Sequence, residues 1–166
     1  MHCEKCGRTA DGSASYCAGC GAALTSQEGK APGDVTIDWL REVLAKAGYS
    51  STPSEKTPET LSCKHDRRSN VQLRIQRELG LITGTYWWKL QKPGWGGEAK
   101  LLAAINQANA NAWRQTYAVD TDGDLIVSFY ILLANRLSEG DILQFLEKEQ
   151  TGFTATASTT LKDFIK

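Results

Sequence analysis

The chain of 166 residues has no excess of either charge, since lysine plus arginine and aspartate plus glutamate number 19 each. A balanced protein has no overall attraction to nucleic acid or to an anionic membrane surface. The sequence also lacks any apolar run near the ~18 residues that span a bilayer, and its N-terminus has no apolar signal region. We therefore expect a cytoplasmic protein without membrane contact, for which nucleic acid is a poor candidate ligand.

Cysteine is scarce outside one short segment. Four of the five cysteines form two C-x-x-C pairs within the first two dozen residues, and the fifth, Cys63, stands alone. An odd number of thiols in a chain without a secretion signal is typical of a reducing compartment. In such a compartment, paired cysteines more often bind metal than form disulfides.

The spacing of the two pairs predicts a zinc ribbon at residues 1–23. Zinc prefers four tetrahedral thiolate or imidazole ligands, and each C-x-x-C turn supplies two sulfurs. Gly7 and Gly21 follow the pairs directly, where a residue without Cβ lets the backbone turn sharply and present amides to the sulfurs. Four thiolates leave no position for water, so we expect one structural Zn²⁺. The predicted ligands are Cys3, Cys6, Cys17 and Cys20.

Three alternatives remain open for this segment. The cysteines could form two disulfides or a redox-active pair, although a thioredoxin-like motif needs a βαβ context that does not surround them. His2 could replace one sulfur as a ligand. The ribbon could also contact nucleic acid, but its few cations are offset by carboxylates and by the thiolates, and Tyr16 is its one aromatic residue. We therefore favour docking of the ribbon against a protein.

Composition divides the rest of the chain into two parts. Residues 24–33 are small and polar and include Pro32 and Gly33, so we expect a flexible linker. Residues 34–166 contain almost all of the large apolar side chains and form the main domain. The predicted organisation is therefore a ribbon, a linker and one globular domain.

Hydrophobic periodicity predicts the elements of the main domain. A first helix begins with Asp34 as its N-cap and ends near Gly48, and a last helix begins at Ser138 in a capping box with Asp141. The apolar stripe of the last helix keeps one phase as far as Phe164, which predicts a single long helix, with an interruption near Gly152 as the alternative. This order of elements predicts an α+β fold in which helices pack on an antiparallel sheet. The other expected elements are an irregular Ser-, Thr- and Pro-rich passage at 50–60, strands at 61–64, 71–76 and 81–90, a helix at 98–112 and a hairpin at 115–134.

Several segments of the main domain resemble a known family. Leu102-Ala-Ala-Ile-Asn106-Gln-Ala-Asn109 is followed by Asp120-Thr-Asp-Gly-Asp124 and a second apolar strand, and the opening helix ends in Ala47-Gly-Tyr49. Over roughly residues 34–166 this progression resembles the YbjN family of bacterial sensory-transduction regulators. The resemblance implies a fold similar to type III secretion chaperones and a protein-binding regulatory or chaperone-like role, without catalytic residues. Asn106 and Asn109 match the family pattern, and we expect them to cap their helix and bridge it to neighbouring strands.

Two other candidate sites are weaker. The three aspartates of residues 120–124 imitate the start of a calcium loop, but its sixth position lacks the required glycine and Ile131 replaces the bidentate glutamate. An aspartate-rich hairpin turn explains them better. Cys63 and His65 would share one face of a strand, but a nucleophile pair also needs an orienting group and a pocket. We therefore expect no catalysis at this pair.

Tryptophans are the candidate partner-binding residues. Trp87 and Trp88 are adjacent, so on a strand one belongs to the core and the other is exposed or covered by a helix, as interface anchors often are. Trp95, on a glycine-rich loop, is a further candidate. The cations between residues 64 and 77 are diluted by carboxylates and are typical of a solvated face.

These features predict a non-enzymatic protein-binding adaptor, regulator or chaperone-like protein with a structural zinc ribbon. Homodimer formation is plausible because chaperone-like folds often dimerise. The alternative is a nucleic-acid-associated regulator that uses the ribbon for contact, which predicts steeply salt-dependent binding. A hydrolase using Cys63 is a third class, and it predicts labelling of that thiol by mild alkylators at neutral pH.

Overall fold

A computed structural model describes residues 3, 5–9, 16–22, 29–91, 97–112, 114–133 and 136–165. Beyond the cysteine segment, the described chain forms three helices, two short 3-10 turns and one six-stranded sheet. None of its helices is long and apolar enough to cross a membrane. The elements are η1 (Pro32–Asp34), α1 (Ile37–Lys46), β1 (Ser50–Pro53), β2 (Thr60–Lys64), β3 (Val71–Gln76), η2 (Arg77–Leu79), β4 (Leu81–Lys89), α2 (Gly97–Asn111), β5 (Thr116–Val119), β6 (Asp124–Leu132) and α3 (Glu139–Thr159).

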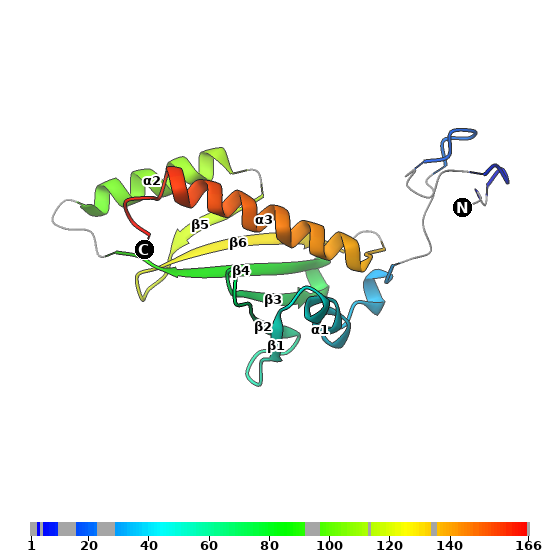
Figure 1. Cartoon of the computed structure of the whole chain (residues 1–166), viewed down its shortest axis with the longest axis horizontal. Helices are drawn as coiled ribbons and strands as arrows, with labels where there is room; N and C mark the ends of the chain where they lie inside the picture. Colours follow the sequence, from blue (N-terminus) through cyan, green and yellow to red (C-terminus); the bar gives the residue numbers. More distant parts are fainter. Residues whose placement is uncertain are drawn as a thin grey trace.

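The strands form one antiparallel sheet in the order β1-β2-β3-β4-β6-β5. The central pair is β4 and β6, whose register runs from Leu81 opposite Leu132 to Lys89 opposite Asp124. Figure 1 shows α2 and α3 on the same side of the sheet. The prediction of an α+β fold with an antiparallel sheet and packed helices is confirmed.

The core lies between the sheet and the helices. Alternate residues of each strand point to this side, as the period of two in a strand requires. In β3 these are Val71, Leu73 and Ile75, and all three are buried. The helices contribute buried side chains such as Leu40 from α1 and Ile142 from α3 to the same cluster. Contact between α1 and α3 places all three helices on this one side of the sheet.

The opposite side of the sheet is not covered by any helix that the structure describes. We call this surface the open face. Its residues are half-buried or exposed, and Trp87, Tyr130 and Leu132 are among the most exposed large apolar side chains. From β2 to β6 the open face consists of Ser62, Lys64, Gln72, Arg74, Gln76, Leu81, Thr83, Thr85, Trp87, Lys89, Asp124, Ile126, Ser128, Tyr130 and Leu132.

The start of α1 differs from the prediction. Asp34 ends the 3-10 turn η1, in which its amide donates to the Ala31 carbonyl. The N-cap is instead Thr36, whose hydroxyl accepts a hydrogen bond from the Trp39 amide at 3.2 Å. Threonine and aspartate both cap helices well, so composition alone does not choose between neighbouring candidates.

The predicted irregular passage at 50–60 contains a strand. β1 occupies Ser50–Pro53 and pairs only with β2. An edge strand needs one hydrogen-bonding partner, so it tolerates serine, threonine and a terminal proline. The polar composition of residues 50–60 therefore gave no indication of this edge strand.

The last helix is shorter than predicted. α3 ends at Thr159, and Leu161 follows it in a turn in which its amide still donates to the Thr156 carbonyl. Leu161 is fully buried, so the apolar phase continues although the helix does not. The chain then returns to the end of β4, where Leu90 and Ile165 form a β-bridge. The predicted capping box of Ser138 and Asp141 is confirmed.

The end of the expected linker is attached to the main domain. Lys30 and Leu137 exchange backbone hydrogen bonds of 2.8 and 2.9 Å, just before α3. The Arg136 side chain donates from Nε to the Gly29 carbonyl at 3.0 Å. These bonds fix the point at which the N-terminal segment leaves the domain, whereas residues 24–28 of the linker lie outside the described residues.

Candidate metal centre

The two C-x-x-C pairs adopt matching turns. In the first, the Cys3 amide donates to the Arg8 carbonyl and the Gly7 amide donates to the Cys3 carbonyl. In the second, Cys17 and Gly21 repeat the same pair of bonds, with Ala22 in the place of Arg8. Both glycines are left-handed, with φ of 69° at Gly7 and 67° at Gly21. A residue with Cβ would be strained there, which explains a glycine directly after each pair.

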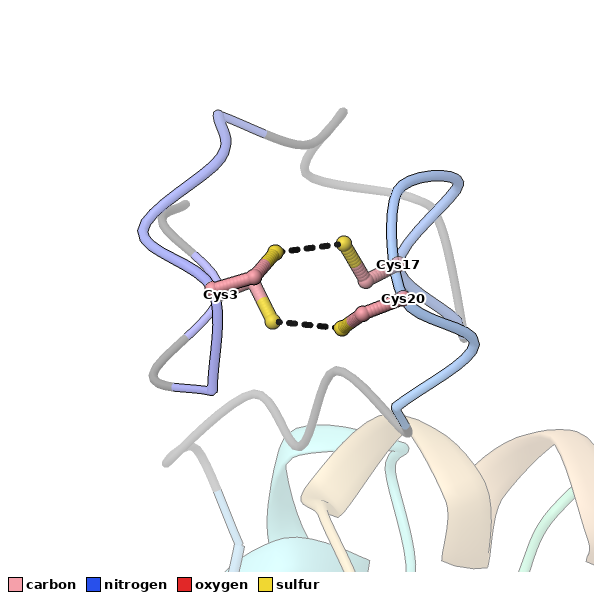
Figure 2. Close-up of side chains that lie close together, drawn as sticks. Cys3, Cys17 and Cys20 are labelled. Carbon is pink, nitrogen blue, oxygen red and sulfur yellow. Dashed lines mark hydrogen bonds between the residues drawn. The ribbon is translucent and has the colours of Figure 1, made fainter.

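The four sulfurs converge on one point. Cys3 Sγ lies 3.6 Å from Cys20 Sγ, and Cys6 Sγ lies 3.5 Å from Cys17 Sγ, so each short contact joins the two turns. Figure 2 shows the side chains of Cys17 and Cys20 pointing from one turn toward Cys3 on the other. All four ligand atoms lie within 4.8 Å of one another, and the cluster can hold a metal ion.

The donor set fits zinc. Tetrahedral Zn–S bonds of ~2.3 Å would place neighbouring sulfurs ~3.8 Å apart, close to the two short contacts. Cys3 and Cys17 are buried, whereas Cys6 and Cys20 are exposed. A zinc ion held by all four thiolates would join the two turns and have no open position for substrate. His2, the alternative ligand, lies outside the described residues.

The electrostatics of the cluster favours a cation at its centre. Amide hydrogen bonds from Gly19, at 3.3 Å from Sγ, and from Cys20 hold the pKa of Cys17 at about 6, below its usual 9.0. The pKa of Cys20 is raised to about 12. The Ala22 amide lowers this pKa, but desolvation and the other three sulfurs raise it more. The Cys17 thiol therefore ionises readily, whereas the neighbouring sulfurs oppose ionisation of the Cys20 thiol. A divalent ion would remove this repulsion.

The adjacent tryptophans divide between the two sides of the sheet. Trp88 packs against Phe153 of α3, with ring centroids 3.5 Å apart, and so belongs to the core side. Trp87 lies on the open face and is 43% exposed. Trp87 is therefore the member of the pair that is available to a partner, while Trp95 lies outside the described residues.

Cys63 lies in the core and not in a pocket with His65. It is 1% exposed, and burial raises the pKa of its thiol, which opposes the thiolate that a nucleophile requires. His65 accepts the Arg67 amide at Nδ1 and packs edge-on against the Tyr49 ring, 4.8 Å away. Neither contact orients a base toward the Cys63 sulfur.

The aspartate-rich hairpin uses its carboxylates within the turn. Asp120 Oδ1 accepts the amides of Asp122 and Asp124 at 3.0 and 2.8 Å. Asp124 Oδ2 pairs with Lys89 Nζ on the neighbouring strand at 2.8 Å. These are the bonds of a structural turn, as the sequence analysis favoured.

Comparison with known proteins now identifies the family. A family model described as "Putative bacterial sensory transduction regulator", YbjN, matches residues 36–149. The chain belongs to the YbjN family. The match includes every strand of the sheet and leaves the cysteine segment outside the YbjN domain. No curated protein matches the sequence significantly.

Two solved structures share this fold. The crystal structure titled "YbjN, a putative transcription regulator from E. coli" aligns with a TM-score of 0.60 at 12% identity, covering 80% of this chain and 96% of that chain. A protein from Methanothermobacter thermautotrophicus, titled as uncharacterized, aligns with a TM-score of 0.58 at 10% identity, covering 78% of this chain and 99% of that chain. At such identities the likeness shows the fold alone.

Sequence reasoning missed how the open face of the YbjN domain is composed. Arg74 and Tyr130 share one row of the open face and Trp87 lies four residues away along the strands, although the three residues come from three different strands. The alternation in β3 predicts Arg74 on the polar side of its strand, opposite the buried residues. Tyr130 sits in a largely apolar run, Leu125–Leu133, in which Ser128 is the single polar residue and does not by itself mark the outward positions.

Proposed function

We propose that this protein is a non-enzymatic regulatory adaptor of the cytoplasm that binds a protein partner. Membership in a family described as a transduction regulator supports the regulatory role. The exposed Trp87 on a sheet surface without a covering helix is the observation that carries the binding role. Large aromatic residues at such places are typical anchors of protein interfaces.

The proposal gives the cysteine segment a structural zinc ion and a second recognition role. Support comes from the four convergent sulfurs, the matching turns and the absence of a fifth donor among the described residues. Segments this small fold when metal binds, with apparent binding energies on the order of 10 kcal/mol. A reducing cytoplasm would keep the four thiols available. The same proposal keeps the predicted domain organisation, with a zinc ribbon at residues 1–23, a linker at 24–33 and the YbjN domain at 34–166.

Metal analysis tests the zinc centre. We expect one zinc per purified chain, and we expect Cys17→Ser to lose it because a site with three thiolates binds zinc far more weakly. Cys63→Ser is the matched control and should retain one equivalent, since Cys63 lies in the sheet core. Thiol titration should show four cysteines protected by metal and released by a chelator. Oxidised pairs in the purified chain would contradict the proposal.

Affinity capture from the native cytoplasm tests the adaptor role. The full chain, Cys17→Ser and Trp87→Ala are compared, with Leu102→Ala as a control because Leu102 is 59% exposed on α2, a helix on the other side of the sheet. We expect the wild type and the control to recover the same protein, and each of the other variants to lose part of it. Recovery of nucleic acid alone would favour the alternative regulator.

A further inference from the structure

The open face combines aromatic side chains with cations in two rows. In the register of the sheet, Lys64 shares a row with Trp87, and Arg74 shares a row with Tyr130. Within each row the cation and the aromatic residue lie two strands apart, ~10 Å at the usual strand spacing. The two rows are four residues apart along the strands, ~14 Å. The open face therefore presents two pairs of a cation and an aromatic residue, and both pairs have the same orientation.

The net charge of this surface is positive. Lys64 and Arg74 form no ion pair with any residue that the structure describes. Asp124 is the single carboxylate among the strand residues of this face, and Lys89 already neutralises it. At the Trp87 end, a hollow of about 500 Å³ is also lined by Arg67, Arg68 and Asp66, so that one of its two arginine charges is offset by a carboxylate. A ligand with carboxylates along one side would complement this distribution.

The apolar residues indicate a protein and not a nucleic acid. Leu132 is 59% exposed beside Tyr130, and Ile126 lies beside Trp87. Aliphatic side chains give bases nothing to stack on, whereas they pack well against leucine and isoleucine. Among the described strand residues of this face, Lys64 and Arg74 are the unpaired cations, which are few for a phosphate backbone, whose affinity rises with each neutralised phosphate.

A helix is the element that fits a sheet face. The other face of this sheet already packs α2 and α3 along its strands, and a helix on the open face would complete a three-layer arrangement. The ~14 Å between the two rows corresponds to about nine helical residues at ~1.5 Å each. A helix of at least four turns would therefore reach both aromatic residues with one apolar stripe, while carboxylates flanking that stripe reach Lys64 and Arg74.

We propose that the open face binds an acidic amphipathic helix of the protein partner, with its apolar stripe on Trp87 and Tyr130 and its carboxylates toward Lys64 and Arg74. The inference rests on the proposed adaptor function and specifies the chemistry of its partner. It requires no contribution from the cysteine segment. Binding at this face should therefore persist when the zinc site is lost.

Fluorescence anisotropy with three labelled probes tests this inference. The probes are a 20-residue helical peptide of glutamate, alanine and leucine, the same peptide with lysine replacing glutamate, and a 20-nucleotide oligothymidylate. The full chain should bind the acidic peptide alone, and the affinity should fall as salt rises from low to high concentration. Arg74→Glu and Trp87→Ala should each weaken binding about tenfold.

Matched variants make the result specific to the open face. Lys100→Glu makes the same charge change at an exposed position of α2, and Leu102→Ala removes an exposed apolar side chain there. Both should bind the acidic peptide as the wild type does, and so should Cys17→Ser. Circular dichroism checks that every variant is folded.

Four outcomes would overturn the inference. These are no binding of the acidic peptide, equal binding of the lysine peptide, oligothymidylate binding that Arg74→Glu abolishes, and a dimer that Trp87→Ala dissociates in sedimentation. If the wild-type chain still captures a protein through Trp87 while the acidic peptide fails, the adaptor function stands without this partner chemistry. If capture fails as well, both proposals fall.

Discussion

At the scale of single residues, Gly84 shows how one missing side chain shapes the core. It faces Phe129 across the central strand pair, and a Cβ at this position would lie 1.9 Å from the Phe129 ring. The ring therefore occupies the space that a larger residue on β4 would need. A glycine inside a strand commonly marks such a close approach.

Replacing this glycine should destabilise the domain. We expect Gly84→Ala to lower the free energy of unfolding by about 1–3 kcal/mol, because Phe129 must leave its position in a packed core. Urea unfolding followed by tryptophan fluorescence measures the change. Gly140→Ala is the control: a Cβ there meets only the Ser138 hydroxyl at 3.7 Å, and alanine in a helix is neutral or stabilising. Equal stability of Gly84→Ala and the wild type would contradict the packing described.

Glu149 gives the stability of the domain a dependence on pH. It is 6% exposed on α3, and desolvation raises the pKa of its carboxyl, although the Gln115 side chain and Arg114 lower it in part. A raised pKa means that the folded state holds the proton more tightly than the unfolded state. The contribution of Glu149 is therefore most favourable below its ordinary pKa of 4.5 and is lost as the pH rises through the folded value.

Glu149→Gln should thus be more stable than the wild type at pH 7, and the difference should disappear toward pH 4. Urea unfolding at intervals between pH 4 and pH 8 measures it. Glu147→Gln, an exposed position two residues earlier on α3, should show no such pH-dependent gain. A destabilised Glu149→Gln at neutral pH would mean that the carboxylate is needed in its charged form.

At the scale of elements, Asn109 joins α2 to the edge of the sheet. Its Nδ2 donates to the Tyr117 carbonyl at 2.9 Å, and its Oδ1 accepts the Tyr117 amide at 2.7 Å. A side-chain amide thus makes the two bonds that a neighbouring strand would make to β5. This confirms the bridging role expected of Asn109, whereas Asn106 is exposed and makes no such bond to any described residue.

Asn109→Ala should cost about 1–3 kcal/mol of stability, because the amide and carbonyl of buried Tyr117 lose both partners. Asn106→Ala, on the same helix, serves as the matched control and should change stability by less than about 0.5 kcal/mol. Chemical denaturation of the two variants measures the difference. Similar losses in both variants would indicate a general effect on α2.

The elements also show which features of this protein follow from its sequence. Alternation such as that of Val71, Leu73 and Ile75 defines the buried strands, because burial on one side imposes a period of two. The cysteine centre can be predicted from the sequence equally well, because its ligands and turns lie within one short segment. By contrast, β1 is defined by its pairing with β2 and not by its own polar composition. The end of α3 depends on contacts far along the chain, as the bridge between Leu90 and Ile165 illustrates. The open face depends on the register of several strands, which no local pattern fixes.

At the scale of the whole molecule, the attachment of Gly29 and Lys30 makes a prediction about truncation. A chain that begins at Gly29 keeps the bonds to Arg136 and Leu137, whereas one that begins at Asp34 loses all three. We expect the shorter chain to melt roughly 3 °C or more below the longer one, since each lost bond contributes up to ~1 kcal/mol. All five tryptophans lie between residues 39 and 113, so fluorescence follows this domain alone. Identical melting temperatures would show that the contact adds no stability.

That attachment also determines how far the cysteine segment can travel. Seven peptide steps separate Ala22 from Gly29, so these residues can be at most about 25 Å apart. Two binding elements held within such a radius experience each other at effective concentrations in the millimolar range. A partner captured weakly by either element is therefore delivered to the other, and modest individual affinities would combine into a long-lived complex.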